Sequence, residues 1–318
     1  MRLGIDLGGT KIEIIALDDS GKELLRRRVP TPQGNYYETL QAIAQLVRDA
    51  EAELGQRGSV GIGTPGALSR ATGRLKNSNS VVLNGQPILQ DLGVLLQRKV
   101  KISNDANCFA LSEATDGAAT GAEVVFGVIL GTGVGAGIVV NGHILIGPNG
   151  IAGEWGHNPL PWPQADELSV PQCYCGKQGC IETFLSGPGM AKLHEIDNKE
   201  SVRPELVEGK DSVCVSTGST RTELLSSAEI MARAEQGDAA CERSLQTYEN
   251  RLARSLAHVI NILDPDTIVL GGGMSNIERL YTNVPELWGN WVFSDRVDTR
   301  LVKHHFGDSS GVRGAAWL

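Results

Sequence analysis

The first thirty residues alternate between apolar runs and short polar turns. Apolar side chains recur over residues 3–7, 11–17 and 23–29, and the breaks between these runs contain glycine, threonine, aspartate and serine. Short runs bounded by turn residues are typical of β-strands. The pattern predicts a three-stranded β-meander at the N-terminus.

Helical spacing follows the meander. Leu40, Ile43, Val47, Ala50 and Leu54 recur on one helical face before a glycine, which predicts a helix over residues 36–54. The later predicted elements are a strand over 59–63, a helix after Pro87, a strand over 100–103, a helix capped by Asn104 and Asp105, helices over 226–236, 238–263 and 309–317, and a strand over 267–270.

The meander pattern returns in the middle of the chain. Residues 124–130, 135–141 and 143–146 predict three more strands, with a Gly-Thr-Gly turn at residues 131–133 that resembles the Gly-Gly-Thr turn at residues 8–10. Backbone N–H groups in a glycine turn form a concavity that can hold a phosphate oxygen, although a single such turn can also be a plain hairpin. The chain is therefore predicted to be duplicated, with two turns that grip one polyphosphate.

Composition narrows the class of protein. The chain has 318 residues, 41% of them hydrophobic, and a formal net charge of -8, which suggests roughly two domains and disfavours a nucleic-acid surface. The nearest approach to a basic run is residues 26–28, expected to finish an exposed strand. No signal-like segment and no apolar run of about 18 residues is present. We expect a soluble, cytoplasmic protein with reduced cysteines that binds neither nucleic acid nor membrane.

A compact cluster of cysteines follows a histidine. His157, Cys173, Cys175 and Cys180 supply the thiolate and imidazole ligands that zinc favours, and four protein ligands make a closed, structural site. The alternatives are buried thiols or a disulfide pair. Because Glu154 precedes and Glu182 follows the cluster, a bound zinc would fix two carboxylates that suit a polar ligand.

Two common nucleotide motifs are absent. The P-loop pattern fails because no Gly-Lys pair precedes Ser or Thr. A literal G-x-G-x-x-G at Gly61, Gly63 and Gly66 is interrupted by Pro65 and lacks a following helix, so it predicts a strand end and a turn. The looser match beginning at Gly131 continues as a strand where a dinucleotide site needs a helix.

Several motifs together resemble the ROK sugar kinases: D-L-G-G-T-K at residues 6–11, N-D-A-N at 104–107, L-G-T-G-V-G-A-G at 130–137, E-W-G-H at 154–157, C-x-C-G-x-x-G-C-I-E at 173–182 and G-G-G-M at 271–274. The segment 156–162 looks most like the bacterial fructokinase and mannokinase branch. The resemblance implies an α/β, actin-like ATPase fold of two ribonuclease-H-like domains around a cleft. We expect domains at 1–118 with 305–318 and at 119–304, and a homodimer.

The resemblance also implies roles for individual residues. Asp105 would be the general base that takes the proton of the attacking sugar hydroxyl, and Asp6 would organise a magnesium ion. His157 would hold zinc with one ring nitrogen and orient a sugar hydroxyl with the other. The sugar-binding residues would be Gly66, Asn79, Asn104, Glu154, His157 and Glu182. ATP would be bound by Gly4, Ile5, Asp6, Leu7, Gly8, Gly9, Thr10, Lys11, Thr132, Gly133, Val134, Gly135, Ala136, Gly137, Ile138, Gly271, Gly272 and Gly273.

One segment departs from the family pattern. Residues 197–223 are polar and irregular, and they predict a mobile loop that contains the isolated Cys214.

These observations predict an ATP-dependent kinase that phosphorylates the 6-hydroxyl of fructose, and of mannose as a second substrate, with ATP, Mg²⁺ and a structural Zn²⁺. A glucokinase or an N-acetylhexosamine kinase on the same scaffold is the alternative. A sugar-sensing repressor is a remote alternative, since the first meander starts at Arg2 with no helix-turn-helix ahead of it and the net charge is negative.

Overall fold

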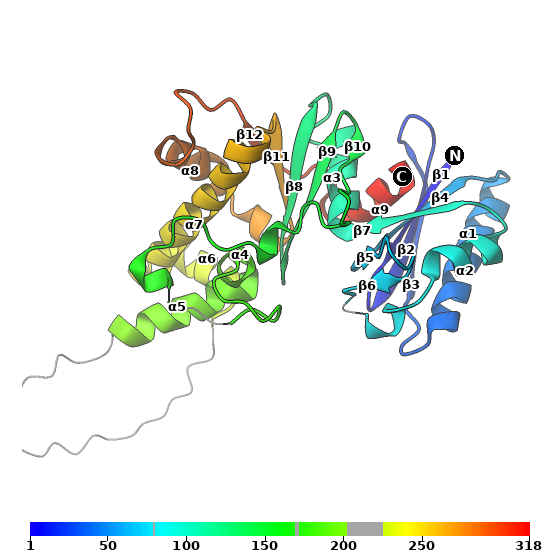
Figure 1. Ribbon diagram of the computed structural model, residues 1–318, viewed down its shortest axis with the longest axis horizontal. Coiled ribbons are helices and arrows are strands. Elements are labelled where there is room, and N and C mark those ends of the chain that lie inside the picture. The colour runs from blue at the N-terminus through cyan, green and yellow to red at the C-terminus, as the bar shows by residue number, and fades with distance from the viewer. Residues whose placement is uncertain (79, 169–171, 202–224) are drawn as a thin grey trace, which may run out of the picture.

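Two five-stranded sheets form the framework of the protein (Figure 1). The computed structural model describes residues 1–78, 80–168, 172–201 and 225–318. The first sheet has the order β3-β2-β1-β4-β7, with β1 (Arg2–Leu7), β2 (Lys11–Leu17), β3 (Glu23–Pro30), β4 (Ser59–Thr64) and β7 (Val100–Asn104). The second has the order β10-β9-β8-β11-β12, with β8 (Val124–Leu130), β9 (Val134–Val140), β10 (His143–Ile144), β11 (Thr267–Gly271) and β12 (Arg300–Lys303).

Both sheets are built in the same way. In each, three consecutive strands pair antiparallel, a later strand runs parallel beside the first strand of that meander, and a further strand runs parallel beside the later one. Both predicted meanders and the duplication are confirmed. The strand predicted over 143–146 ends at Ile144, because the chain turns away toward Gly147, whose φ is +71°. A small hairpin of β5 (Ala67–Leu68) and β6 (Leu75–Lys76) follows β4.

The predicted helices form where the apolar spacing and the capping residues placed them. The helix α1 (Tyr36–Leu54) has Asn35 as its N-cap, whose side chain accepts from the Glu38 amide, and Gly55 ends it at φ +64°. The other α-helices are α2 (Ile88–Leu96), α3 (Asp105–Thr115), α4 (Ile181–Leu185), α5 (Gly187–Ser201), α6 (Ser227–Glu235), α7 (Ala239–Leu263), α8 (Leu280–Leu287) and α9 (Ser310–Trp317).

The helices α3 and α9 join the two halves, and each follows the last strand of one sheet but packs on the other sheet. A Cβ on Gly4 of β1 would lie 2.1 Å from the Val312 oxygen of α9, and one on Gly127 of β8 would lie 2.8 Å from Ala110 of α3. Glycine is therefore needed at both places because a helix backbone lies directly on the strand. The predicted domain boundaries, at residues 118/119 and 304/305, stay a prediction. The helices α3 and α9 contact each other, and together they contact both sheets.

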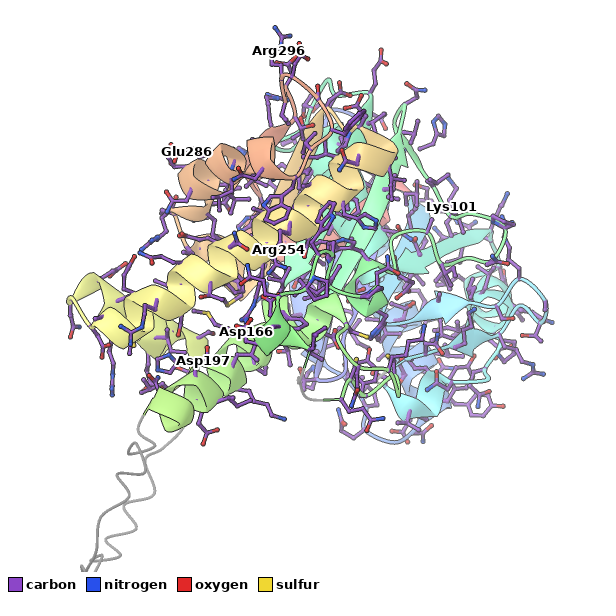
Figure 2. All side chains as sticks on the ribbon, turned by 60° about the vertical axis from the view of Figure 1, so that its left-hand side comes forward. Lys101, Asp166, Asp197, Arg254, Glu286 and Arg296 are labelled. Carbon is purple, nitrogen blue, oxygen red and sulfur yellow. The ribbon has the colours of Figure 1, made fainter. Side chains whose placement is uncertain are left out.

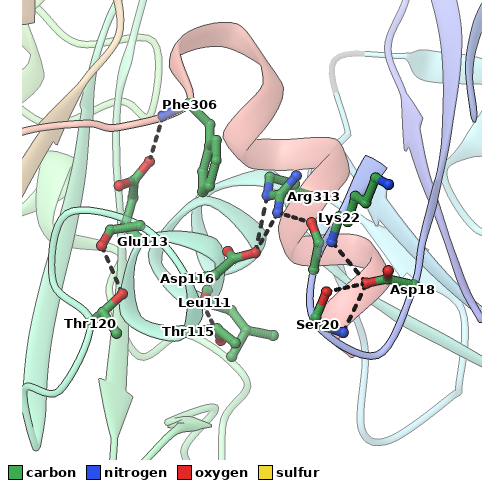
Figure 3. A network of polar contacts seen from close by, with 12 residues as sticks. Asp18, Ser20, Lys22, Leu111, Glu113, Thr115, Asp116, Thr120, Phe306 and Arg313 are labelled. Carbon is green, nitrogen blue, oxygen red and sulfur yellow. Dashed lines mark hydrogen bonds and ion pairs between the residues drawn. The ribbon is translucent and has the colours of Figure 1, made fainter. Parts of the chain in front are cut away.

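Polar contacts strengthen this junction (Figure 3). Glu113 of α3 is fully buried and accepts hydrogen bonds from the His305 amide (3.0 Å) and the Ser310 hydroxyl (2.7 Å). Figure 3 shows its further contact with the Phe306 amide (3.5 Å). Arg313 of α9 donates to Asp116 with its Nε (3.2 Å) and also to the Gly21 carbonyl. The segment that leads into α9 is thereby fixed against α3.

Three sequence-based expectations fall near the undescribed parts of the chain. Residues 197–201, predicted to begin a mobile loop, instead continue α5, so the prediction is wrong there. Their polar composition suggested a loop, but the Asn198 side chain donates to the His194 carbonyl one turn earlier, as a helical residue can. Asn79, Cys214 and the rest of the predicted loop lie outside the described residues.

Among the described helices, none has the length and apolar character needed to cross a membrane.

Candidate active site

A cavity of about 290 Å³ lies between the end of β1 and the start of α3. Three carboxylates reach it from distant parts of the chain: Asp6 on β1, Asp105 on α3 and Asp308 just ahead of α9. The rest of the lining is Leu7, Gly8, Gly9, Pro65, Phe109, Ile129, Gly272, Gly307 and Gly311. The fold thus brings the predicted base, the predicted magnesium residue and the first glycine turn to one place.

Asp105 is the first residue of α3. Asn104 caps the helix by accepting from the Asn107 amide (2.9 Å), and Asp105 Oδ1 accepts from the Ala106 amide (2.8 Å). The carboxylate stays open to the cavity, but the surrounding walls exclude much of the bulk water. This partial desolvation raises the pKa of Asp105, and the negative charge of Glu154 adds to the rise. The side chain is therefore held in place and suited to accept a proton.

Asp6 carries the second carboxylate of the cavity. Burial, then the charges of Asp105 and Glu13, raise its pKa to about 6, while Lys11 and Arg28 act in the opposite direction. Neighbouring carboxylates that raise each other's pKa create a demand for a cation. Carboxylate oxygens that line a cavity with room for water fit Mg²⁺, which retains several of its waters in proteins.

The second glycine turn is only partly open. Residues 135–138, predicted to cradle phosphate, lie within β9, where they pair with β8. A Cβ on Gly137 would lie 2.6 Å from the Ala106 oxygen, and one on Gly271 would lie 2.6 Å from the Phe109 ring. These glycines are explained by the close packing of α3. At the tip of the turn the Gly131 amide donates to the Gly133 carbonyl (2.9 Å), so among the described contacts only the amides of Thr132 and Gly133 are left for a phosphate.

A larger cavity of about 460 Å³ adjoins that tip. Its lining combines Gly131, Thr132 and Gly273 with residues the sequence interpretation missed, namely Gly187, Pro188, Ala191, Ser226, Ser227, Ala228, Met231 and Met274. Apolar walls next to a phosphate-binding turn fit a nucleoside. The Ser-Gly-Pro-Gly break at residues 186–189 was the one sequence signal for this pocket, since it starts α5 beside the turn.

Glu182 links the predicted sugar residues to the second glycine turn. Its Oε2 accepts from the Val134 amide at 2.8 Å, so this predicted phosphate-binding amide is already occupied. A Cβ on Gly133 would lie 2.7 Å from the same oxygen. Gly133 therefore leaves the space in which the carboxylate reaches the turn.

The other predicted sugar residues lie on several elements. Glu154 precedes the 3₁₀ turn Trp155–His157 and acts electrostatically on Asp105. The side-chain oxygen of Asn104 is used in capping α3, which leaves its amide nitrogen. Gly66 lies in the turn after β4 at φ +85°, where a Cβ would be 2.4 Å from the Lys76 oxygen. The predicted strand end and turn at residues 61–66 are thus confirmed.

The four predicted zinc ligands converge. Their ligand atoms all lie within 4.8 Å of one another, with 3.6 Å between Cys175 Sγ and Cys180 Sγ and 3.6 Å between Cys173 Sγ and His157 Nδ1. A disulfide would need about 2.05 Å between sulfurs, and these three cysteines are free. Zinc–sulfur bonds of about 2.3 Å in a tetrahedron give edges of about 3.8 Å. The residues therefore fit zinc.

Tyr174 is a site residue that the sequence interpretation missed. It stands between two of the cysteines, its side chain is 82% exposed, and its hydroxyl lies 2.9 Å from His157 Nε2. The second nitrogen of His157, expected to be free for a sugar, is instead bonded to this phenol. Desolvation, then the charge of Glu182, raises the pKa of Tyr174, and Glu154 contributes as well. The phenol therefore feels the negative charge of both predicted sugar carboxylates.

A buried ion cluster anchors the segment after His157. Arg254 of α7 (Figure 2) donates to the carbonyls of Pro161 (3.1 Å) and Trp162 (2.6 Å) and to the carboxylate of Glu167 (2.7 Å). Arg251 donates to the same carboxylate at 2.8 Å, and all three charged side chains are buried. Removing one member would leave a buried charge without its partner, so residues 161–167 are fixed to α7.

Comparisons with known proteins extend over the whole chain. Residues 2–318 match the model of the ROK family. N-acetyl-D-glucosamine kinases from Salmonella paratyphi B and Yersinia enterocolitica are each 38% identical over 322 residues, covering 100% of this chain and 99% of the relative. The crystal structure of a ROK hexokinase from Thermus thermophilus superposes with a TM-score of 0.80 at 30% identity, covering 99% of this chain and 96% of that one. A ROK family glucokinase from Streptomyces griseus, in complex with glucose and AMPPNP, gives 0.72 at 26% identity, with 99% and 97% covered.

These relatives overturn the fructokinase prediction. Full-length relatives at 38% identity are N-acetyl-D-glucosamine kinases, so the assignment to fructose is wrong. The assignment rested on residues 156–162, and the structure explains part of that stretch by anchoring, because Pro161 and Trp162 supply carbonyls to Arg254. The stretch therefore reports how a loop is held and does not identify the sugar.

Proposed function

This chain belongs to the ROK family and is a sugar kinase, and on that premise we propose that it transfers the γ-phosphoryl group of ATP to the 6-hydroxyl of N-acetyl-D-glucosamine. The observation that carries the choice of sugar is the full-length identity of 38% with N-acetyl-D-glucosamine kinases. The meeting of Asp6, Asp105 and the first glycine turn in one cavity supports the chemistry.

Asp105 acts as the general base in this proposal. It accepts the proton of the 6-hydroxyl while the oxygen forms a bond to the γ-phosphorus and the bond to the β-phosphate oxygen breaks. Its raised pKa favours proton uptake at the moment of attack. A Mg²⁺ ion beside Asp6 would supply positive charge to the phosphate oxygens. The cavity next to Thr132 and Gly273 receives the adenosine.

The sugar is held by groups fixed around the cysteine cluster. Glu154 and Glu182 accept hydrogen bonds from sugar hydroxyls, and Tyr174 and Asn104 contribute further polar atoms. His157, Cys173, Cys175 and Cys180 would hold a zinc ion, which would stiffen the loops that carry the two glutamates and would take no part in the chemistry. Because Glu182 also accepts from Val134, the sugar and the second glycine turn share one side chain.

An ADP-release assay with N-acetylglucosamine, N-acetylmannosamine, glucose, mannose and fructose tests the proposal. We expect kcat/KM for N-acetylglucosamine to exceed that for each other sugar by about tenfold or more, since buried polar groups discriminate strongly against sugars that leave them unpaired. Phosphorus NMR of the product checks the 6-position. Absence of N-acetylglucosamine turnover contradicts the proposal, and a preference for glucose supports the glucokinase alternative.

A further inference from the structure

The arginines at positions 26–28, expected to finish an exposed strand, are divided between the two faces of β3. Arg27 pairs with Glu53 of α1 on one face. Arg26 and Arg28 point to the other face, where both donate to Glu13, with 2.6 Å between Arg28 Nε and Glu13 Oε2. A strand alternates its side chains in this way, so the run is not a single basic patch.

Arg28 belongs to a row of charged residues that starts at the cavity. Asp6 of β1 is directly opposite Glu13 of β2, and Glu13 is directly opposite Arg28 of β3. Directly opposed residues share a face of the sheet, and strands are about 4.8 Å apart. Arg28 therefore starts about 10 Å from Asp6, a distance that a long side chain spans. Asp308, which lines the same cavity as Asp6, acts electrostatically on the guanidinium as well.

The guanidinium has unused donors. Glu13 is 1% exposed and its charge needs a partner, which Arg26 and Arg28 provide. Arg28 uses only Nε for this, and within the described residues its two terminal nitrogens have no hydrogen bond, while 47% of its side chain is exposed. The hydrogen bond and charge of Glu13, followed by the charges of Asp308 and Asp6, raise the pKa of Arg28. Arg28 therefore stays positively charged, and Glu13 fixes the orientation of its guanidinium by binding Nε.

Arg28 does not line the cavity itself, but a guanidinium beside it has a definite use there. Phosphoryl transfer spreads negative charge over the oxygens of the γ-phosphoryl group, and a guanidinium with two free nitrogens matches that geometry. We propose that Arg28 is a phosphate-binding residue of the transfer site, and that Glu13 positions it by holding Nε. The proposal rests on ATP-dependent transfer at this cavity but not on the identity of the sugar.

Two matched variants test the role. Arg28→Gln and Arg26→Gln each remove one ion pair to Glu13, but only Arg28 is in the register row with Asp6. Calorimetry with Mg²⁺ should give AMPPNP binding at least tenfold weaker in Arg28→Gln, with adenosine binding within twofold of the wild type. In Arg26→Gln both affinities should stay within threefold. With a sugar present, kcat of Arg28→Gln should fall by about 10- to 100-fold, as when one preorganised donor is lost.

The two arginine positions separate a phosphate contact from a structural ion pair. An equal change of the AMPPNP-to-adenosine affinity ratio in both variants overturns the proposal. If Arg28→Gln does not fold, Arg28→Lys and Arg26→Lys replace it as the test pair, because both keep a positive charge beside Glu13. Equal changes of the AMPPNP-to-adenosine affinity ratio in these two variants would also overturn the proposal. These measurements need no sugar. A wild type inactive on N-acetylglucosamine would therefore contradict the proposed function and leave the Arg28 result standing.

Discussion

The two halves of the molecule have the same sheet order but different side chains at equivalent positions. Before the first glycine turn, Asp6 is paired with Glu13, and before the second, Ile129 is paired with Gly135. The first half thus contributes charged groups beside its turn. The second half contributes packed backbone, together with the cavity proposed for the nucleoside and the cysteine cluster. Duplication supplied a common framework, and the chemistry was divided between the copies.

The largest effect is expected from removing the proposed general base, Asp105, which belongs to the first half. Asp105→Asn keeps a capping oxygen for the Ala106 amide but no longer takes a proton. We expect kcat to fall by about 10²- to 10⁴-fold, while the dissociation constant for N-acetylglucosamine, measured by calorimetry, stays within about threefold. Asp19→Asn, on an exposed turn, is the control with normal turnover. A kcat for Asp105→Asn near that of the wild type would remove Asp105 from this role.

The proposed zinc site of the second half is tested by Cys175→Ser. Loss of one thiolate should lower zinc content, measured by mass spectrometry of the purified protein, from about one per chain toward zero. Affinity for N-acetylglucosamine should fall in parallel, by about tenfold or more, since Glu154, Tyr174 and Glu182 lose their support. Cys241→Ala, in α7 outside the cluster, should keep its zinc. Loss of zinc without any change in sugar affinity would separate the cluster from the sugar site.

The hydrogen bond from the Val134 amide to Glu182, which connects the second glycine turn with the proposed sugar site, is tested by Gly133→Ala. The new Cβ would displace the Glu182 oxygen that it approaches to 2.7 Å and break the bond to Val134. Losing a hydrogen bond to a charged group should weaken sugar binding by about tenfold. Gly131→Ala has nothing within 4 Å of its Cβ and is the matched control for calorimetry with sugar alone. Equal sugar affinities in the two variants would show that the Glu182 bond does not support the sugar.

The smallest effect concerns the pH dependence of stability in the first half. The folded pKa of Asp6, about 6, exceeds the ordinary value of 3.8, so the folded protein holds this proton more tightly than the unfolded chain does. Ionised Asp6 therefore lowers stability, and this loss develops as the pH rises from about 4 to about 6 and persists above it. Asp6→Asn should raise Tm by a few degrees at pH 7.5 and leave it nearly unchanged at pH 4.

A control of opposite sign is available nearby. The pKa of Asp18 is lowered by the Ser20 hydroxyl and the Lys22 amide, so its charge contributes stability that is present at neutral pH and lost as the pH falls through the folded pKa. Asp18→Asn should lower Tm slightly at pH 7.5. A lower Tm for Asp6→Asn at pH 7.5 in the absence of Mg²⁺ would contradict the conclusion that ionised Asp6 lowers stability.

Local patterns in the sequence determined much of the framework. Apolar alternation predicted both meanders, helical spacing predicted α1, and the cap at Asn104 predicted α3, because each of these depends on residues close together in the chain. The short spacing of Cys173, Cys175 and Cys180 likewise made their convergence predictable. Polarity misled at residues 197–201, because a polar sequence is compatible with both a helix and a loop.

Tertiary structure alone decided the contacts between distant segments. The sequence does not reveal that Asp6, Asp105 and Asp308 share a cavity, that Arg28 faces the same side as Asp6, or that Met231 and Met274 line one pocket. The sequence also did not distinguish the glycines of the proposed phosphate turns from Gly137, which makes room for α3. The physical reason is that local spacing fixes each strand and helix, whereas the packing of the two sheets through α3 and α9 fixes which side chains meet.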